Sequence, residues 1–191
     1  ISRTLFFQQD FIMTKIALII GSLSRASINR TVAQHLAAQA PEGVVVEEVQ
    51  IGDLPLYTQD LDSESIPAYE RVRAQLQAAD AVLIVSPEHN RSMPAAVKNL
   101  LDIASRPAGK SLWGGKKTAV ITASPGSYGG INSGLHIRQS LQAMSADVMI
   151  APEVFLSRAH TALADGQVND ERTAAFLNKF AAAFYGWAQT E

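Results

Sequence analysis

Short apolar stretches of strand length alternate along the chain with longer segments in which apolar residues recur at helical spacing. The stretches cover residues 15–20, 44–49, 81–86, 117–123 and 147–151, and residues 154–156 can extend the last one. They are rich in valine, isoleucine and other residues that favour extended backbone. Each is therefore predicted to form a β-strand, which gives five strands in chain order.

The segments between the strands carry helix signals. We expect helices over residues 31–38, 68–79, 94–105, 131–145 and from about 170 to 189. Ser27 is a suitable N-cap for the first helix, and Asn169 or Asp170 can cap the last one. Pro67 and Pro94 suit the first turns of two others. Strand and helix thus alternate through the whole chain.

This alternation predicts an α/β fold with a parallel sheet and right-handed crossovers. The stretch from Ala81 to Val85 is apolar at every position, as expected for a strand that helices cover on both faces. No repeat or linker indicates a second domain, so residues 14–191 are interpreted as one domain. Residues 1–13 are interpreted as an upstream extension or expression remnant, and residues 51–65 as a connection or lid.

Composition narrows the function by exclusion. The 191 residues are 47% hydrophobic and 18% charged, with a formal net charge of -2, so we expect neither nucleic acid nor an anionic membrane as a partner. Cysteine is absent, which excludes disulfides, thiolate catalysis and thiolate metal sites. The longest apolar runs are too short to span a bilayer, and the first twelve residues do not resemble a secretory signal. A cytoplasmic protein is expected.

The polar stretch Gly21–Arg30 follows the first predicted strand and leads into the first predicted helix. It offers three serine hydroxyls, Asn29 and Arg25 beside the unpaired N–H groups of a helix start. This combination is suited to a phosphomonoester. The same residues could serve only as capping and turn residues, and the stretch by itself does not decide between the two.

Two further polar loops, residues 87–93 and 124–130, also follow predicted strands directly. The carboxyl ends of parallel strands share one edge of the sheet, where α/β proteins bind ligands at the point at which the strand order reverses. Three polar loops at that edge predict a ligand site more strongly than any one of them.

Several nucleotide and hydrolase motifs are missing. The first loop has a single glycine, so the dinucleotide fingerprint Gly-x-Gly-x-x-Gly is absent. Gly109-Lys110-Ser111 resembles the end of a P-loop, but Ala104 stands where its first glycine belongs. No Gly-x-Ser-x-Gly elbow is present, and the histidines lack metal-ligand spacing, so no metal site is expected.

The motifs taken together resemble the NADPH-dependent FMN reductase family, a flavodoxin-like group that includes quinone, azo-dye and chromate reductases. They are Gly21-Ser22-Leu23 with Ser27 and Asn29; Pro87-Glu88-His89-Asn90 with Ser92 and Pro94; Lys98-Asn99 with Asp102; and Ser124-Pro125-Gly126 with Gly129-Gly130 and Arg138-Gln139. The resemblance covers about residues 14–191. It implies a three-layer, doubly wound sheet of strand order 2-1-3-4-5.

The resemblance also implies a noncovalently bound FMN. The implied phosphate contacts are Ser22, Ser24, Arg25, Ser27, Ile28 and Asn29. The implied ring contacts are Pro87, Glu88, His89, Asn90 and Arg91 on one side and Ser124, Pro125 and Gly126 on the other. No catalytic side chain is assigned, because the flavin carries out the redox chemistry and the protein orients it.

The implied activity is transfer of a hydride from NADPH or NADH through FMN to quinones, flavins or similar small acceptors such as azo compounds or chromate. A homodimer or homotetramer is implied as well. The alternative is a flavodoxin-like electron carrier or phospho-ligand-binding protein without NAD(P)H turnover. Near-neutral composition favours the enzyme, since flavodoxin-type carriers tend to be strongly acidic.

This chain departs from the family pattern at two site positions. Ser24 stands where arginine is common, and Arg25 follows it, so either residue could dominate the phosphate contact. His89 replaces the usual tyrosine, which would change the surface beside the ring. Two roles also stay open at this stage. Glu88 is either a structural cap or intersubunit ion pair, or a ring contact, and Tyr128 is either a subunit contact or a lid.

Overall fold

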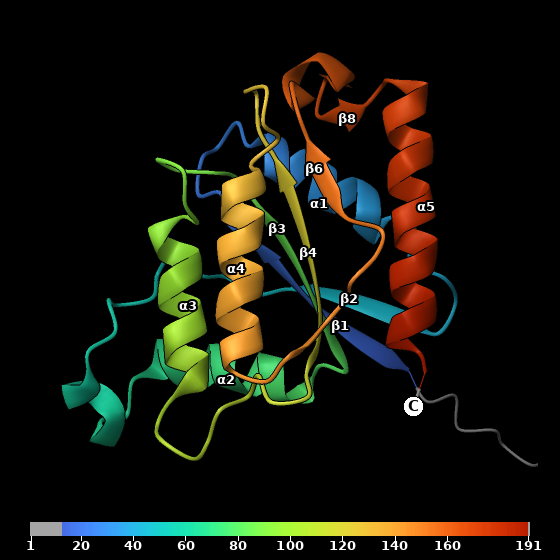
Figure 1. Ribbon diagram of the computed structural model, residues 1–191. Coiled ribbons are helices and arrows are strands. Elements are labelled where there is room, and N and C mark those ends of the chain that lie inside the picture. The colour runs from blue at the N-terminus through green and yellow to red at the C-terminus, as the bar shows by residue number, and fades with distance from the viewer. Residues whose placement is uncertain (1–12, 191) are drawn as a thin grey trace, which may run out of the picture.

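The computed structural model describes residues 13–190, so the interpretation of residues 1–13 falls almost wholly outside the described part. Its main sheet is parallel and has the order β2-β1-β3-β4-β5, which confirms the implied order (Figure 1). Its strands are β1 (Thr14–Ile20), β2 (Val44–Glu48), β3 (Ala81–Ser86), β4 (Lys117–Ala123), β5 (Asp147–Val148) and β6 (Val154–Leu156). All six residues of β3 are buried, as its uniform pattern predicts.

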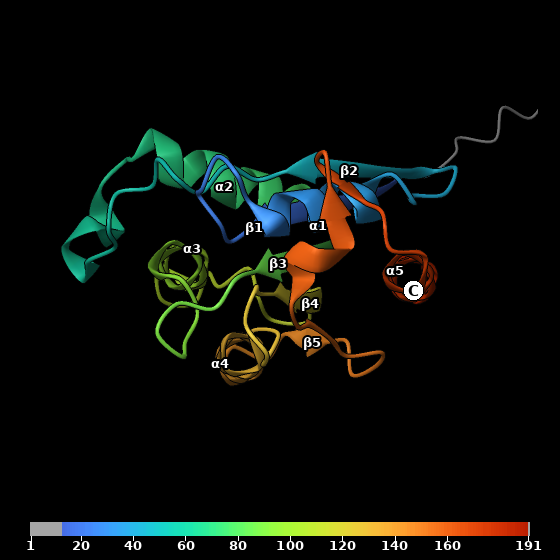
Figure 2. The same cartoon turned by 90° about the horizontal axis from the view of Figure 1, so that it is seen from above.

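Helices cover both faces of this sheet and give three layers, most clearly in the view from above (Figure 2). One layer holds α1 (Ile28–Ala37) and α5 (Glu171–Ala188), and the other holds α2 (Pro67–Ala78), α3 (Ala95–Ser105) and α4 (Ile131–Ala143). Each layer packs its own apolar core against the sheet. Leu36 and Phe180 belong to the first core, and Leu76 and Leu100 to the second.

The predicted fifth strand is interrupted, which corrects the single stretch expected over residues 147–151. β5 and β6 both pair with β4, with Val148 opposite Thr118 and Val154 opposite Ile121. Pro152 lies between them and has no N–H to continue a ladder. The carbonyl of Met149 instead accepts a hydrogen bond from Arg138 Nη1 of α4 at 2.7 Å.

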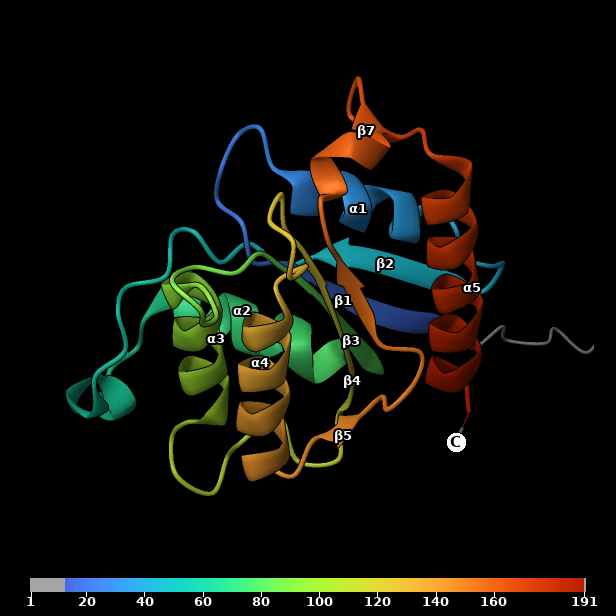
Figure 3. The ribbon, with the colours of Figure 1, turned by 45° about the horizontal axis from the view of Figure 1, so that its top comes forward.

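A small hairpin that the hydrophobic pattern does not predict precedes α5. It consists of β7 (Leu163–Ala164) and β8 (Gln167–Val168), follows the 3-10 turn η2 (Ala159–Ala162), and lies beside α1 (Figure 3). Asp165 and Gly166 at its tip both have positive φ, 53° and 73°. That backbone is typical of a type I′ turn, for which Asp-Gly is a favoured sequence.

The long connection after β2 is fastened to α3, although it has little regular structure beyond the 3-10 turn η1 (Gln59–Ser63). Asn99 Oδ1 accepts from the backbone N–H of Tyr57 at 2.8 Å, and Asn99 Nδ2 donates to the carbonyl of Pro55 at 3.0 Å. Arg106 donates to Tyr57 Oη and to Asp62. Of the two expectations for this segment, these contacts favour a fixed connection over a lid. In residues 13–190, no helix combines the length and apolar character needed to cross a bilayer.

Candidate functional site

The three polar loops meet at one edge of the sheet, because they follow neighbouring parallel strands. Residues 21–27 follow β1, residues 87–94 follow β3 and residues 124–130 follow β4, and all three lie at the upper end of the molecule in Figure 1. Between β1 and β3 the chain switches faces, since α1 covers one side of the sheet and α3 the other. Ligands of such sheets bind at this switch point.

Gly21 lets the first two loops approach closely. Its N–H donates to the carbonyl of Val85 at 2.8 Å, which extends the pairing of β1 and β3 by one residue. A Cβ at this position would lie 2.7 Å from Ser86 Oγ and 2.8 Å from Val97 Cγ2. No larger residue fits there without displacing its neighbours.

The start of α1 presents a set of hydrogen-bond donors. Ser27 is the N-cap that the sequence predicts, since its Oγ accepts from the backbone N–H of Arg30 at 3.1 Å. The N–H groups of Ile28 and Asn29 have no acceptor within residues 13–190. Ser24 and the guanidinium of Arg25 are exposed beside them. Unpaired helix-start N–H groups, hydroxyls and a cation fit a phosphomonoester, so the residues present suit the phosphate of FMN.

Arg30 follows the same loop, but its guanidinium is already engaged in an ion pair. It forms a two-pronged ion pair with Glu48 of β2, at 2.7 and 2.9 Å, which holds α1 to the edge of the sheet. The hydrogen bonds from Arg30 lower the pKa of the Glu48 carboxyl, and the same bonds raise the pKa of Arg30. Arg25, which has no ion-pair partner in the described chain, is therefore the better placed cation for a phosphate.

Asn29 joins the first loop to the third. It is only 3% exposed, and its Nδ2 donates to the carbonyl of Ala123 at the end of β4, at 3.1 Å. Its Oδ1 is buried without a donor among the described residues. The phosphate contact expected of Asn29 stays a prediction, while its contact with Ala123 is a structural role that the sequence does not reveal.

The second loop is a tight turn anchored to α4. His89 and Ser92 exchange two backbone hydrogen bonds, of 2.9 and 3.0 Å, and Asn90 and Arg91 between them have positive φ. The carboxylate of Glu88 accepts from the first-turn N–H groups of α4, those of Asn132 and Ser133, at 3.0 and 3.3 Å.

Among the roles considered for Glu88, the structural cap is confirmed. The imidazole of His136 on α4 adds a second anchor, because its Nδ1 lies 2.9 Å from Ser92 Oγ. His89 itself is exposed at the edge of the loop. Its place beside the ring of FMN stays a prediction.

The third loop is fixed by β6 and the residues after it. The N–H of Ser124 donates to the carbonyl of Leu156, and the carbonyl of Gly126 accepts from the N–H of Arg158, both at 3.0 Å. A Cβ on Gly129 would lie 2.5 Å from the carbonyl oxygen of Phe155, and this glycine has φ of 63°. Ser124, Pro125 and Gly126 are thereby held at the carboxyl end of β4, with the last two exposed.

The structure shows two features of this edge that the sequence did not predict. The guanidinium carbon of Arg91 lies 4.7 Å from the ring centroid of Tyr128, which links the second and third loops. A cavity of about 440 Å³ also separates the start of α1 from the β7–β8 hairpin, with Arg25, His160 and Asp165 among its lining residues. The turn sequence Asp165-Gly166 is the signal that could have revealed this hairpin.

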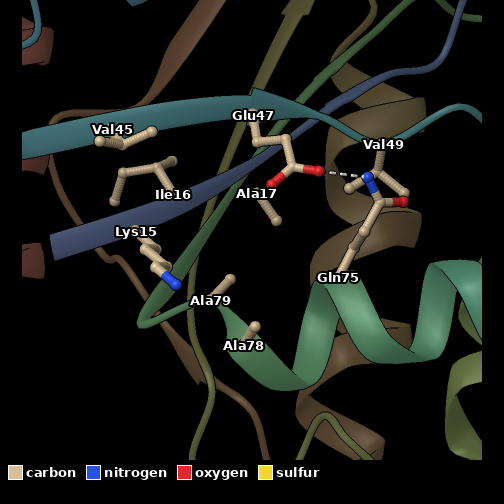
Figure 4. A pocket seen from close by; sticks show the side chains of 9 residues that line it. All are labelled: Lys15, Ile16, Ala17, Val45, Glu47, Val49, Gln75, Ala78 and Ala79. Carbon is tan, nitrogen blue, oxygen red and sulfur yellow. Dashed lines mark hydrogen bonds between the residues drawn. The ribbon is translucent and has the colours of Figure 1, made fainter. Parts of the chain in front are cut away.

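Another cavity, of about 90 Å³, lies away from the loops (Figure 4). It is bordered by β1, β2 and the end of α2, and Gln75 Nε2 donates to Glu47 Oε1 across it at 2.6 Å. Lys15 at the amino end of β1 also borders it, and none of its lining residues belongs to the three polar loops.

The sheet order and the phosphate-type loop at its switch point define a flavodoxin-like α/β protein. The family model for NADPH-dependent FMN reductase matches residues 14–161. The chain is 43% identical to a quinone reductase of Pseudomonas putida, over 91% of this chain and 94% of that protein. It is 39% identical to a 2-hydroxy-1,4-benzoquinone reductase of Burkholderia sp, over 92% and 96% of the two chains. The chain belongs to the NADPH-dependent FMN reductase family.

Solved structures agree with this assignment. FerB, a flavoenzyme NAD(P)H:(acceptor) oxidoreductase from Paracoccus denitrificans, superposes with a TM-score of 0.85 at 35% identity, covering 93% of this chain and 98% of that one. A flavodoxin mutant from Pseudomonas aeruginosa has a TM-score of 0.56 at 21% identity, which shows the shared fold alone. The enzyme class, an FMN-dependent NAD(P)H oxidoreductase, and its FMN cofactor are thus confirmed.

Proposed function

We propose that this enzyme reduces quinones, with NADPH or NADH as the source of electrons. The observation that carries the acceptor class is the full-length similarity to two proteins named for quinone reduction, at 43% and 39% identity. In the overall reaction, NAD(P)H gives up a hydride and the quinone gains two electrons and two protons, one of them from solvent. FMN supplies the redox chemistry when it is bound.

The residues that hold the phosphate end of FMN are proposed to be those at the start of α1. The backbone N–H groups of Ile28 and Asn29 would donate to phosphate oxygens, and Arg25 would neutralise their charge. The hydroxyls of Ser22, Ser24 and Ser27 would donate the remaining bonds. Ser27 can do so while it caps the helix, because its oxygen accepts from Arg30 and its hydrogen stays available.

The ring of FMN is proposed to lie between the second and third loops. Pro87, Glu88, His89, Asn90 and Arg91 would form one side, and Ser124, Pro125 and Gly126 the other. The anchors described above support this proposal, since both loops are held rigidly with their tips exposed. Donors fixed in place beside the ring would stabilise negative charge that develops during reduction. No side chain is proposed as a covalent nucleophile.

Quinone-dependent oxidation of NADPH tests the proposal directly. The holoenzyme should oxidise NADPH steadily when 1,4-naphthoquinone is supplied, with one hydroquinone formed for each NADPH consumed. An azo dye and chromate, assayed in parallel, would define the breadth of acceptors. Oxidation of NADPH at the same slow rate with and without every acceptor would instead favour an electron carrier.

Self-association and a cytoplasmic location complete the proposed function. Ile131 and Leu135 expose apolar surface on α4, which supports a homodimer or homotetramer built through this face. Sedimentation of wild type and Leu135→Glu would test the interface, and the variant should shift toward monomer. Lack of cysteine and use of NAD(P)H are compatible with a reducing cytoplasm.

A further inference from the structure

Arg91 occupies an unusual place for an arginine. It stands at the tip of the second loop with φ of 64°, directly after Asn90 with φ of 49°. A left-handed backbone costs a residue with a Cβ about 1 kcal/mol, and such strain persists where the surrounding structure fixes it. Here the two hydrogen bonds between His89 and Ser92 close the turn and hold Arg91 outward at the ligand edge of the sheet.

The aromatic ring of Tyr128 supports the guanidinium of Arg91 at 4.7 Å from the ring centroid. This cation–π contact uses no nitrogen or oxygen acceptor, so it leaves N–H donors of the guanidinium available to bind something else. The side chain of Arg91 is 64% exposed, and it donates no hydrogen bond within the described residues. Tyr128 is 64% exposed as well, so the pair offers both a cation and an aromatic surface.

The one carboxylate beside Arg91 in the described chain is already engaged. Glu88 Oε1 lies 3.7 Å from Arg91 Nη1, which is too far for a hydrogen bond. The other oxygen, Oε2, accepts from two N–H groups at the start of α4, and the side chain of Glu88 is only 12% exposed. Glu88 therefore helps to position Arg91 without using its donors.

Two other arginines lie near this edge, where Glu88 and Asp165 are the acidic residues named above. Arg25 is exposed at the first loop, and Arg158 follows β6 with its N–H bound to the third loop. The chain as a whole carries a formal charge of -2, so this edge differs from the average of the molecule. A positive edge attracts negatively charged ligands and accelerates their association.

We infer that Arg91, supported by Tyr128, recognises acceptors that carry a negative charge beside an aromatic ring, such as ionised hydroxyquinones or quinone sulfonates. This inference rests on the proposed reduction of quinones at this edge. Arg91 would donate in-plane hydrogen bonds to the anionic oxygen, while Tyr128 provides ring surface. The preference is measured as the ratio of the affinities, or of the rates, for a charged and a neutral acceptor of the same shape. A general loss of activity affects both acceptors and leaves this ratio unchanged.

A binding measurement separates this preference from turnover. The oxidised holoenzyme is titrated with 2-naphthoate and with 2-naphthamide, which share a ring system but differ in charge, and the flavin absorbance reports each Kd. Wild type should prefer the anion by at least about tenfold, the range of a charge-assisted hydrogen bond. Arg91→Gln should lower this ratio to near one, and Arg91→Lys should recover part of it.

Two further variants and a control define the role of each group. Tyr128→Leu removes the ring but leaves the second loop intact, and it should lower the ratio, whereas Tyr128→Phe should keep it. Lys110→Gln removes the same charge from the exposed connection after α3, at the far end of the strands, and should leave the ratio unchanged. FMN content is measured in every variant so that each titration refers to loaded protein.

A kinetic measurement completes the test. Photoreduced holoenzyme, free of nicotinamide, is mixed anaerobically with 1,4-naphthoquinone or its 2-sulfonate, and the rates of flavin reoxidation are compared. In wild type, the sulfonate should reoxidise the flavin faster than the neutral quinone, and its rate should fall as salt increases. In Arg91→Gln, the sulfonate should lose this advantage. Ratios that are the same in wild type, Arg91→Gln and Tyr128→Leu would overturn the inference. If neither quinone reoxidises wild type, the proposed function fails, while the naphthoate titration still decides the role of Arg91.

Discussion

The amide nitrogen of Asn29 donates to the carbonyl oxygen of Ala123, and this bond joins residues 94 positions apart in the sequence. Asn29 belongs to the first turn of α1, and Ala123 is the last residue of β4. The bond therefore fixes the predicted phosphate loop relative to the loop after β4. The separation of the proposed phosphate site from the proposed ring site depends on this relationship.

Replacement of Asn29 should affect stability as well as FMN binding. Asn29→Ala removes the donor from a buried carbonyl, which costs about 1–3 kcal/mol of the free energy of unfolding. FMN should dissociate more readily as well, because the two loops lose their connection. Urea unfolding of the apoprotein and FMN titration measure the two effects. Asn178→Ala breaks an exposed hydrogen bond to His35 and serves as the control. Unchanged stability in Asn29→Ala would contradict the structural role of the bond.

Glu88 allows charge and hydrogen bonding to be separated at the start of α4. Glu88→Gln keeps an oxygen that can accept from Asn132 and Ser133 but loses the negative charge that favours a helix start. It should cost about 0.5 kcal/mol, whereas Glu88→Ala loses both and should cost about 1–2 kcal/mol. Chemical denaturation of both variants checks the order. Equal stability of the alanine variant and wild type would show that the cap is unimportant.

Gly21 should tolerate no side chain. Gly21→Ala places a methyl group 2.7 Å from Ser86 Oγ and 2.8 Å from Val97 Cγ2, so the unfolding free energy should fall by about 1–3 kcal/mol. FMN affinity should fall too, because the first loop is displaced from the second. Gly114→Ala is a matched control, since nothing lies within 4 Å of its Cβ position. Equal thermal midpoints for the two variants would refute the packing constraint.

Much of this edge could be predicted from sequence, and the reasons are physical. The stretch Ala81–Val85 is apolar at every position, so a strand covered by helices on both faces could be predicted there. Ser27 directly precedes the helix Ile28–Ala37, and serine is a residue type that favours the N-cap position. Each of the three polar loops directly follows a predicted strand, and parallel strands bring the loops at their carboxyl ends to one edge of the sheet.

Other features depend on contacts between distant residues, which a single sequence does not show. The cap that Glu88 provides for α4 is one such feature, because its partners Asn132 and Ser133 lie 44 and 45 positions away in the sequence. The contact between Arg91 and Tyr128 joins two loops with no shared motif. The break between β5 and β6 follows from Pro152, whose effect inside a mostly apolar stretch is easily overlooked.

Tyr185 should make stability depend on pH in the alkaline range. It is 2% exposed, its hydroxyl donates to the carbonyl of Leu36 at 2.8 Å, and burial raises its pKa to about 12. Its unfolded pKa is near 10, so its contribution is complete below pH 10 and is lost as pH rises toward 12. The unfolding free energy should fall by up to about 1.4 kcal/mol per pH unit through this group.

Tyr185→Phe isolates this effect. The variant should be less stable by about 1 kcal/mol at pH 7, because the hydrogen bond to Leu36 is lost. Between pH 10 and 12 its stability should fall less steeply than that of wild type, so the two curves converge and then cross. Urea unfolding at pH 7, 10 and 11.5 provides the comparison. Parallel curves over the whole range would be inconsistent with a buried, protonated hydroxyl at this position.

The central claim is that this chain holds FMN at the edge formed by its three loops and takes electrons from NAD(P)H there. An absorbance spectrum of the protein supplied with FMN and freed of excess, followed by NADPH without oxygen, tests it most directly. We predict flavin bands that remain with the protein and bleach within seconds of NADPH addition. Failure to retain FMN, or retained bands that NADPH does not bleach, would contradict the claim.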